Sequence, residues 1–430
     1  MIKKSKLALL ILSALPLSIQ AADIKVIHAG ELLTVPGKTV LKNQTIIITD
    51  NKITDIQEGF TRAKSIDKDA TLIDLKDSFV MPGLMDMHVH MQFEYGDNQA
   101  SNKLKMSAED TAMQSVSFAK KTLMSGFTTV RDLGGDPQSL YALRDGINKG
   151  WIDGPRVIAS GRVSVTGGHL DVDGMRHDLI EKYSPSTLCD GGAECRKATR
   201  NAIKYGADMI KIASTGGVLS DTNTGTGQQM ADDELKEVVA TAHALGRKVA
   251  SHAHAADGIN AALRAGVDSI EHGSYADEDS ITLFKYSGAY LVPTLLAGDT
   301  VVNMAKTSTF MSEAVKSKAI RVGGDMLKNF SRAYEAGVKI AFGTDSGVSR
   351  HGTNAREAVL MFNAGMKPMD ILKSATVNAA DLIDKSDTLG TLETGKFADI
   401  IAMDENPLKD ISQLEQVEFV MKNGKVYKNL

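Results

Sequence analysis

Aromatic residues are scarce in the sequence, and neither positive nor negative charge is in large excess. Aromatic residues make up only 5% of the 430 residues, whereas 38 residues are glycine, which favours tight strand-to-helix connections over a broad stacking surface. The formal net charge is −4 and the basic residues are dispersed, so the chain lacks the electrostatic footprint of a nucleic-acid-binding protein. We therefore expect no nucleic-acid partner. Apolar residues, at 43%, suffice for a large buried core.

Long apolar runs are absent beyond the N-terminus. There, three lysines precede a short apolar run that ends in the small residues Ala21 and Ala22, which is the layout of a secretory signal. The run is too short to span a bilayer. We predict that residues 1–22 are a signal peptide, that the protein is exported, to a bacterial periplasm, and that it has no membrane partner after cleavage.

Cysteine is scarce, since Cys189 and Cys195 are the only two. In an oxidising compartment they could close a small loop, or they could remain two thiols, and the sequence leaves both open. No second Cys or His pair lies nearby at ligand spacing, which argues against a zinc site here.

Both ends of the chain contain short β-rich segments separated by turn residues. Residues 24–27 and 45–48 are examples near the N-terminus, and residues 397–402 and 417–421 near the C-terminus. We predict that residues 23–78 and 385–430 together form one small composite domain, a β-sandwich.

Between these ends, short apolar strands alternate with helical stretches. The fold class is therefore α/β, and eight candidate strands predict a (β/α)8 TIM-like barrel over residues 79–384. An open, doubly wound sheet is the alternative, but no strand is followed by a glycine-rich dinucleotide turn. The candidate strands are Val80–Met87, Thr128–Arg131, Val157–Ser160, Met209–Ile212, Val249–Ser251, Ser269–Glu271, Leu291–Thr294 and Ile340–Thr344.

Residues able to bind metal follow these strands at their C-terminal ends, where barrel enzymes carry their active sites. His88 and His90 close the first strand, and because residues i and i+2 of a strand share a face, both imidazoles can reach one ion. His252 and His254 repeat this spacing on the fifth strand. His272 and Asp345, at the ends of the sixth and eighth strands, complete a set that converges on one mouth.

Lys211 lies inside the apolar fourth strand. An ammonium that points into a barrel is costly to desolvate, unless carbon dioxide adds to the amine and gives a carbamate, which can bridge two divalent cations. The alternative is a lysine that faces outward and reaches solvent.

The order of these residues resembles the amidohydrolase superfamily. The pattern includes residues 81–84 before the first histidine pair and residues 395–399 near the end. Within the superfamily, residues 166–169, 216–218 and 252–254 resemble the imidazolonepropionase-like or Xaa-Pro dipeptidase-like group, which contains dipeptidases, carboxypeptidases for basic residues and enzymes that degrade ochratoxin.

The resemblance implies a centre of two divalent metal ions, most often zinc, bridged by carboxylated Lys211. The implied metal ligands are His88, His90, Lys211, His252, His272 and Asp345. Spacing alone would permit His252 or His254, and the family pattern favours His252.

The expected reaction is attack of a metal-bridging hydroxide on the amide bond of a dipeptide or an N-acyl amino acid. Amides of the ochratoxin type belong to this expected substrate class. Asp345 would shuttle the proton. His169 and His254 would assist catalysis and bind substrate, and Arg350 and His351 would meet a substrate carboxylate. We expect a small-molecule substrate and a homo-oligomer.

Two alternatives remain at this point. A cyclic amidase or deaminase of the same superfamily would use the same kind of site, although the strand-four lysine argues against a deaminase. A non-catalytic binding protein would be expected to have lost some of the six ligands, and all six are present.

Overall fold

A computed structural model describes residues 22–220 and 225–430 of the protein. The predicted signal peptide, residues 1–22, lies outside the described residues except for Ala22. Within the described ranges, no helix is both long enough and apolar enough to cross a membrane.

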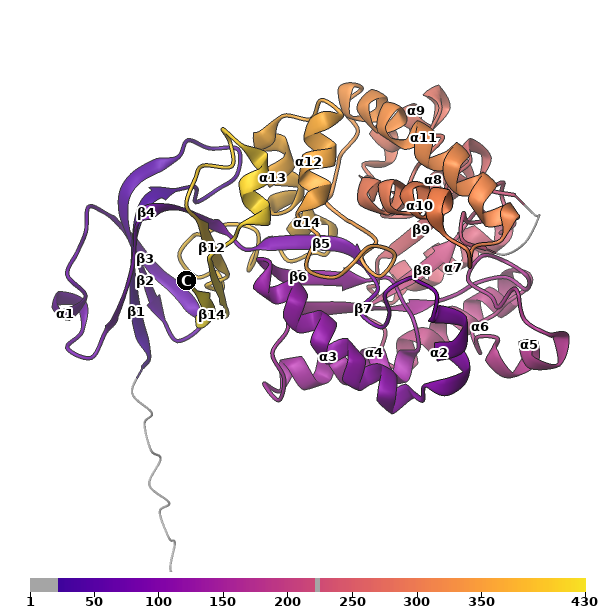
Figure 1. The fold of residues 1–430 in the computed structure, drawn as a ribbon, viewed down its shortest axis with the longest axis horizontal. Helices are drawn as coiled ribbons and strands as arrows, with labels where there is room; N and C mark the ends of the chain where they lie inside the picture. The colour runs from indigo at the N-terminus through magenta and orange to yellow at the C-terminus, as the bar shows by residue number, and fades with distance from the viewer. Residues whose placement is uncertain (1–21, 221–224) are drawn as a thin grey trace, which may run out of the picture.

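The two ends of the chain meet in one seven-stranded mixed sheet, indigo and yellow in Figure 1. Its order is β14-β13-β12-β4-β1-β2-β3. The C-terminal strand β12 pairs antiparallel with the N-terminal strand β4, which joins the two ends. The strands are β1 (Ile24–Leu32), β2 (Leu41–Thr49), β3 (Lys52–Glu58), β4 (Thr71–Pro82), β12 (Ile400–Met403), β13 (Phe419–Lys422) and β14 (Lys425–Asn429).

The core of this sheet also draws on both ends. Ile27 and Ile46 pack in one buried cluster with Ile400 and Phe419. The composite β domain that the sequence predicts is confirmed, and the expected sandwich is a single hydrogen-bonded sheet whose two halves share one core.

A second, parallel sheet of seven strands forms the barrel, in the order β11-β10-β9-β8-β7-β6-β5. Met209, Ala250 and Leu133 form a buried cluster separate from the large cluster of Ile210 and Ile212, as expected for a strand with an inner and an outer face. The strands are β5 (Leu84–Val89), β6 (Phe127–Asp132), β7 (Arg156–Arg162), β8 (Met209–Ala213), β9 (Val249–Ala253), β10 (Ser269–His272) and β11 (Tyr290–Val292).

The barrel is closed by residues 340–346, the predicted eighth strand. The backbone N–H of Ala341 donates to Leu291 O at 3.0 Å, and that of Met87 donates to Phe342 O at 2.8 Å, so this segment lies between β11 and β5. It makes single bridges instead of a regular ladder, and the chain turns at Asp345, whose φ is 57°. The α/β barrel is therefore confirmed, with an irregular eighth member.

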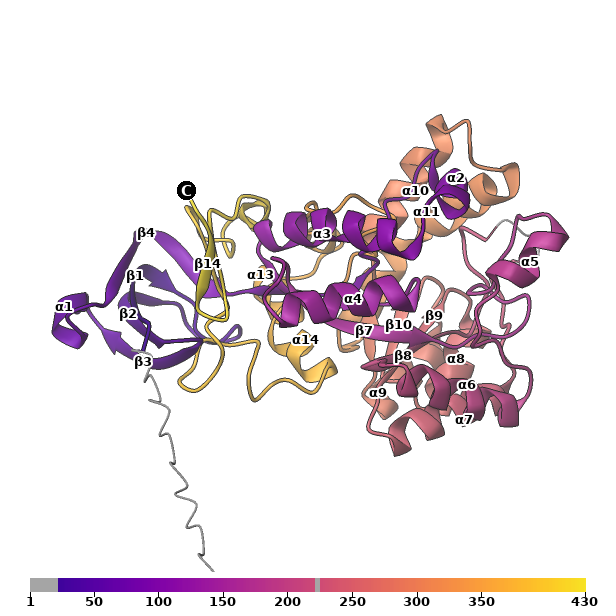
Figure 2. The same ribbon diagram turned by 90° about the horizontal axis from the view of Figure 1, so that it is seen from below.

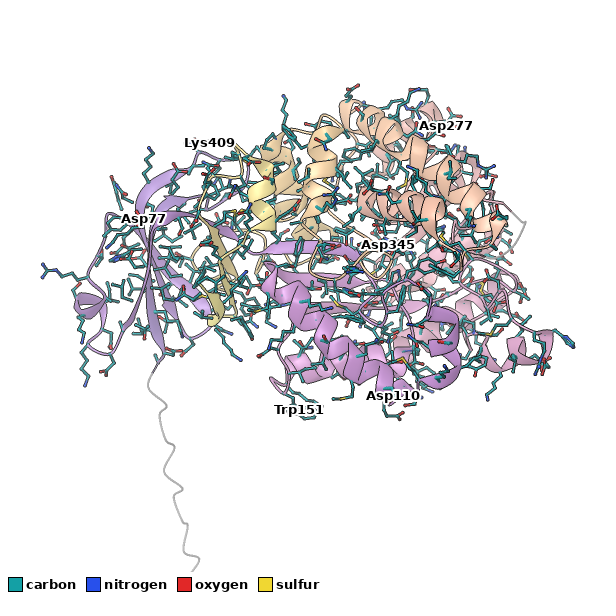
Figure 3. The ribbon with its side chains drawn as sticks, in the orientation of Figure 1. Asp77, Asp110, Trp151, Asp277, Asp345 and Lys409 are labelled. Atoms are coloured by element: carbon teal, nitrogen blue, oxygen red, sulfur yellow. A yellow bond between two sulfur atoms is a disulfide. The ribbon has the colours of Figure 1, made fainter. Side chains whose placement is uncertain are left out.

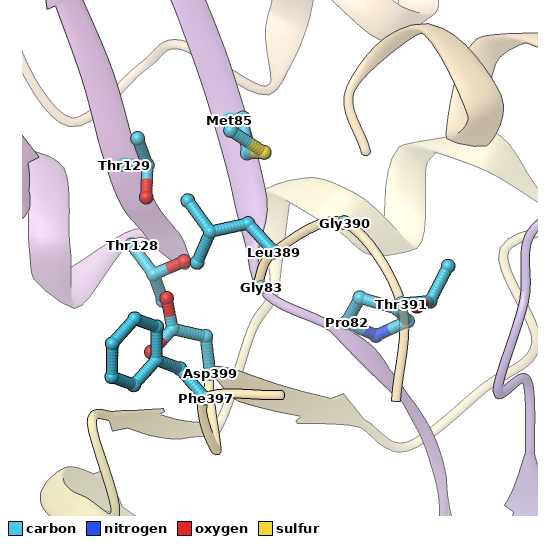
Figure 4. A pocket seen from close by; sticks show the side chains of 10 residues that line it. All are labelled: Pro82, Gly83, Met85, Thr128, Thr129, Leu389, Gly390, Thr391, Phe397 and Asp399. Atoms are coloured by element: carbon cyan, nitrogen blue, oxygen red, sulfur yellow. The ribbon is translucent and has the colours of Figure 1, made fainter. Parts of the chain in front are cut away.

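The predicted first strand belongs to two sheets. β4 ends at Pro82 in the small domain, and β5 begins at Leu84 in the barrel. Gly83 lies between them, and a Cβ atom at this position would lie 2.3 Å from the Thr128 hydroxyl, so only glycine allows the chain to pass here. Beside this crossing lies a cavity of about 10 Å³, shown in Figure 4, which has room for about one water molecule and none for a substrate.

Helices surround the barrel (Figure 2). Two of the longer ones begin at polar caps: Ser107 accepts from Asp110 N before α3, and Asp136 accepts from Ser139 N before α4. The helices are α1 (Ala63–Ile66), α2 (Gln99–Lys105), α3 (Ala108–Met124), α4 (Pro137–Asn148), α5 (His177–Tyr183), α6 (Gly192–Lys204), α7 (Asp232–Ala244), α8 (Ala256–Ala265), α9 (Glu278–Ser287), α10 (Leu295–Thr307), α11 (Glu313–Glu335), α12 (Arg356–Asn363), α13 (Pro368–Ser374) and α14 (Val377–Leu382).

Candidate metal centre

The predicted metal ligands gather at the C-terminal ends of the barrel strands. Asp345, labelled in Figure 3, follows the closing segment, and its carboxylate Oδ1 lies 3.5 Å from His88 Nε2 and 3.3 Å from His90 Nε2. His88, His272 and Asp345 bring three ligand atoms within 4.8 Å of one another. Residues that are far apart in the sequence, and that could bind metal, therefore lie close together in the fold.

A second group of three overlaps the first. His252, His254 and His272 also place their ligand atoms within 4.8 Å of one another. The rings of His252 and His272 lie 4.6 Å apart, and those of His88 and His272 lie 5.2 Å apart. Because His272 belongs to both groups, the two groups form one cluster.

Hydrogen bonds behind the cluster fix the orientation of these rings. Nδ1 of His88 lies 2.9 Å from Glu271 Oε2, and Nδ1 of His90 lies 2.7 Å from Gly134 O. Nδ1 of His272 likewise lies 2.6 Å from Thr294 Oγ1. These contacts leave Nε2 of each ring for a metal ion, which is how metal-binding histidines are usually held.

In the histidine pair of the fifth barrel strand, β9, His254 follows this pattern and His252 does not. His254 uses Nδ1 toward Ser274 Oγ, at 2.8 Å, whereas His252 has its Nε2 3.4 Å from Gly216 O. His252 would therefore offer Nδ1 to an ion and His254 would offer Nε2. Both rings lie at the cluster, so His252 as the ligand of this strand stays a prediction.

Lys211 is buried inside the barrel and only 2% exposed. Among the described residues its Nζ atom has no hydrogen-bond partner. Burial lowers its pKa to about 8, although the charges of Glu271 and Asp345 oppose that shift. A buried amine without a partner is unusual in a folded protein, and it fits a lysine that acquires a further group. The outward-facing alternative is excluded by this burial.

Burial also sets the charge of the cluster histidines. It lowers the pKa of His88 and of His254 to about 4, and it lowers the pKa values of His252 and His272 well below the usual value of a histidine. His90 differs, because its contact with Asp345 outweighs burial and raises its pKa. A cluster of mostly neutral imidazoles beside one carboxylate is a suitable donor set for zinc or a similar divalent ion.

The backbone is strained where the site is built. His272, Thr294 and Asp345 have φ values of 69°, 51° and 57°, a left-handed region that residues other than glycine seldom occupy. Such strain persists only where the surrounding structure holds it, and it is common at functional sites.

Sequence reasoning missed the charged residues behind the ligands. Glu271 accepts from Arg131 Nη2 at 2.8 Å and contacts His88 Nδ1, and all three side chains are almost fully buried. Arg131 and His88 lower the pKa of Glu271 to about 2 against the effect of burial. A glutamate directly before His272, inside an apolar strand, was the available signal.

Asp86 is a second residue that the sequence analysis overlooked. Its carboxylate accepts from Thr344 Oγ1 at 2.6 Å and from Asn354 Nδ2 at 2.8 Å. It thereby ties β5 to the segment that carries Asp345. Its signal is its alternation with His88 and His90, which places it on the inner face of β5.

His169 reaches the cluster from the loop after β7. Its ring lies 4.1 Å from that of His252, and its Nδ1 lies 2.7 Å from Ser220 Oγ. Burial lowers the pKa of His169 to about 3. The predicted position of this residue beside the substrate site is therefore consistent with its surroundings.

The cysteines lie under the loop that carries His169. The structure joins Cys189 and Cys195 in a disulfide, which answers the question that the sequence left open. Asp190, inside the closed loop, accepts from Thr166 Oγ1 at 2.7 Å, three residues before His169. The disulfide thus supports the loop that brings His169 to the cluster.

The two residues expected to meet a substrate carboxylate, Arg350 and His351, differ in their exposure. Arg350 is exposed, and His351 is buried with its ring 4.6 Å from that of Phe118 and its Nε2 3.1 Å from Phe93 O. His351 therefore packs beneath the loop after Asp345, and it is not among the grouped ligands.

Comparison with known proteins assigns the family. The model of the Amidohydrolase family matches residues 79–427. The chain belongs to the amidohydrolase family. Ochratoxinase of Aspergillus niger is 32% identical over 441 residues, which cover 96% of this chain and 88% of that protein. Imidazolonepropionase of Fusobacterium nucleatum subsp. nucleatum is 22% identical over 94% of this chain and 98% of its own length.

Solved structures agree with this assignment. A Xaa-Pro dipeptidase with bound methionine in its active site has a TM-score of 0.89 and 42% identity, covering 95% of this amidohydrolase and 100% of the dipeptidase. The A. niger ochratoxinase structure has a TM-score of 0.85 and 30% identity, covering 96% and 97% of the two chains. The predicted subgroup is therefore confirmed, and this amidohydrolase is a hydrolase that acts on amide bonds.

Proposed function

We propose that this amidohydrolase uses two divalent metal ions, zinc being the expected pair, to cleave the amide bond of dipeptides or N-acyl amino acids. The observation that carries the proposal is the pair of overlapping ligand groups that share His272. The names of relatives such as Xaa-Pro dipeptidase and ochratoxinase support this substrate class.

The residues present fit such a centre. His88, His90 and Asp345 would hold one ion, His252 and His272 the other, and Lys211 would bridge them after carboxylation. The unpartnered Nζ atom of Lys211 supports this last role, because a carbamate at this position would give the buried side chain a reason to lie there. Bound ions would acidify a water molecule and polarise the scissile carbonyl.

The remaining chemistry falls to side chains of the chain itself. Asp345 is the carboxylate beside the Nε2 atoms of His88 and His90, and it is placed to accept a proton from the attacking water and to pass it to the leaving amine. His254 and His169 are buried, neutral imidazoles whose Nδ1 atoms are fixed by Ser274 and Ser220. They are suited to orient the substrate and to donate to its carbonyl oxygen.

We further propose that the protein is exported before it acts. The proposal depends on the signal-like residues 1–22, and the disulfide between Cys189 and Cys195 supports it, since such bonds persist in oxidising compartments.

A substrate screen tests the proposed activity. The metal-loaded protein is incubated with Xaa-Pro and other dipeptides, N-acyl amino acids and cyclic amides, and released amino acid and ammonia are measured separately. We expect free amino acid from at least one dipeptide or N-acyl amino acid, and loss of that activity after chelation. Activity confined to cyclic amides, or release of ammonia alone, would contradict the proposal.

A further inference from the structure

Arg162 is a charged residue on the inner face of the barrel that the proposed mechanism does not use. It ends strand β7, directly after Gly161. Gly161 faces the helices, because a Cβ atom there would lie 2.7 Å from the Ala202 Cβ atom of α6. Strand alternation therefore turns Arg162 to the inside of the barrel.

Its position along the strand is level with the candidate metal centre. Arg162 pairs in register with Lys211 on the neighbouring strand β8. The stem of its side chain lies over Gly134, where a Cβ atom would be 2.6 Å from Arg162 Cγ. The carbonyl oxygen of Gly134 is the partner of His90 Nδ1. Arg162 thus lies beside the backbone group that holds His90, and it is the neighbour of Lys211 across the sheet.

The guanidinium has no fixed counter-ion. Among the described residues it makes no hydrogen bond and no ion pair, and its charge acts on Asp132 and Asp136 only from a distance. Those two carboxylates bind backbone groups instead: Asp132 accepts from Met91 N at 2.7 Å and from Gly134 N at 2.8 Å, and Asp136 accepts from Ser139 N at 2.9 Å. Burying a guanidinium without an anionic partner costs free energy, so the position of Arg162 favours a protein whose ligand supplies the anion.

We propose that Arg162 binds the free carboxylate that dipeptides and N-acyl amino acids carry next to the scissile amide. The inference rests on the proposed function and adds the residue that holds the substrate's carboxylate. A planar guanidinium can hold a carboxylate through two parallel hydrogen bonds, which gives orientation as well as affinity. Arg350, the arginine that the sequence suggested for this task, is exposed.

The test compares two ligands that differ only in the carboxylate. N-benzoyl-L-alanine and N-ethylbenzamide are such a pair, and the same comparison applies to the best N-acyl amino acid of the substrate screen. Binding to the metal-loaded protein is measured by calorimetry, and hydrolysis is measured in parallel. We expect the wild type to prefer the acid roughly 10- to 100-fold, as charge-assisted hydrogen bonds of this kind imply.

Two variants of Arg162 and one control complete the design. Arg162→Met should lose most of the preference, chiefly through weaker binding and higher KM for the acid, while the neutral ligand is little affected. Arg162→Lys should keep part of the preference for the acid. The control is Arg196→Met, which removes a surface arginine of α6 that pairs with Glu237. Metal content and the melting temperature should stay unchanged in all three.

The outcomes separate the two proposals. An unchanged preference for the acid in Arg162→Met would overturn the role of Arg162. An equal loss of binding for both ligands, together with loss of metal, would also overturn it. That result would indicate that Arg162 supports carboxylated Lys211 instead of the substrate. Binding of the acid that depends on Arg162, without any hydrolysis by the wild type, would uphold the carboxylate site and contradict the proposed amide hydrolysis.

Discussion

Single residues of the cluster carry different tasks although they lie within a few ångströms of one another. Burial holds the imidazoles of the cluster neutral except that of His90, while Asp345 keeps its negative charge because His88 and His90 lower its pKa against the effect of burial. Among the described residues, Asp345 is therefore the one carboxylate in the two ligand groups, and it can take up a proton during the reaction.

Asp345→Asn tests this assignment. The amide keeps the size and one ligand oxygen of the side chain but loses the basic carboxylate, so kcat should fall by roughly 10²-fold or more. Circular dichroism and metal analysis should show a folded protein that still binds metal. A kcat close to that of the wild type would transfer the proton shuttle to another group, with His254 the next candidate.

A residue outside the site offers a test of electrostatics. His243 Nε2 lies 2.8 Å from Asp268 Oδ2, and this hydrogen bond raises the pKa of His243. The folded state thus favours the protonated ring. Its stabilising contribution is fully present below the unfolded pKa, about 6.5, and is lost as pH rises through the higher folded pKa. Because His243 is partly exposed, the contribution should stay below about 1 kcal/mol.

The comparison uses urea unfolding of the wild type and of His243→Gln at about pH 5.5 and about pH 8.5. The wild type should be the more stable protein at the lower pH, and the gap in the free energy of unfolding should shrink at the higher pH. A gap that is the same at both pH values would contradict the pKa shift.

At the scale of elements, strands place the ligands and the loops after them complete the site. Alternating faces and apolar runs in the sequence were enough to find the barrel strands and the side chains at their ends that could bind metal. They could not show that Gly83 divides the first predicted strand between two sheets, or that the eighth strand is irregular. Both features depend on contacts with distant segments, such as Thr128 beside Gly83 and Leu291 beside Ala341.

The loop after β8 gives a prediction at this scale. A Cβ atom at Gly217 would lie 2.0 Å from the His169 ring, so Gly217→Ala must displace that ring from His252. Misplacing one substrate-orienting group commonly costs up to roughly 10²-fold in rate. We expect kcat/KM to fall by roughly tenfold or more, with metal still bound.

Gly324→Ala is the matched control. Gly324 lies in helix α11, and a Cβ atom there would have no neighbour within 4 Å. This variant should retain full activity and gain up to about 1 kcal/mol of stability from alanine's higher helix propensity. Normal kcat/KM in Gly217→Ala would show that the position of His169 does not matter for turnover.

At the scale of the whole molecule, the barrel carries the site and the small sheet anchors its first strand. Arg156 joins the two parts, donating to Thr129 Oγ1 and to Asp399 Oδ2, both at 2.8 Å. Such contacts link residues 243 positions apart, as the bond between Arg131 and Glu271 links residues 140 apart. The sequence revealed which residues have the chemistry for a metal site, whereas the charged groups that support it became visible only when distant strands were brought together.

The central claim is that six residues on several strands hold two metal ions bridged by Lys211. Its most direct test is the metal content of the purified mature protein, measured by mass spectrometry together with activity, in the wild type and in Lys211→Ala. The account predicts about two divalent ions per chain in the wild type, and loss of metal and of most activity in the variant. Full activity of the wild type at one ion per chain or none, or unchanged metal content and rate in Lys211→Ala, would contradict it.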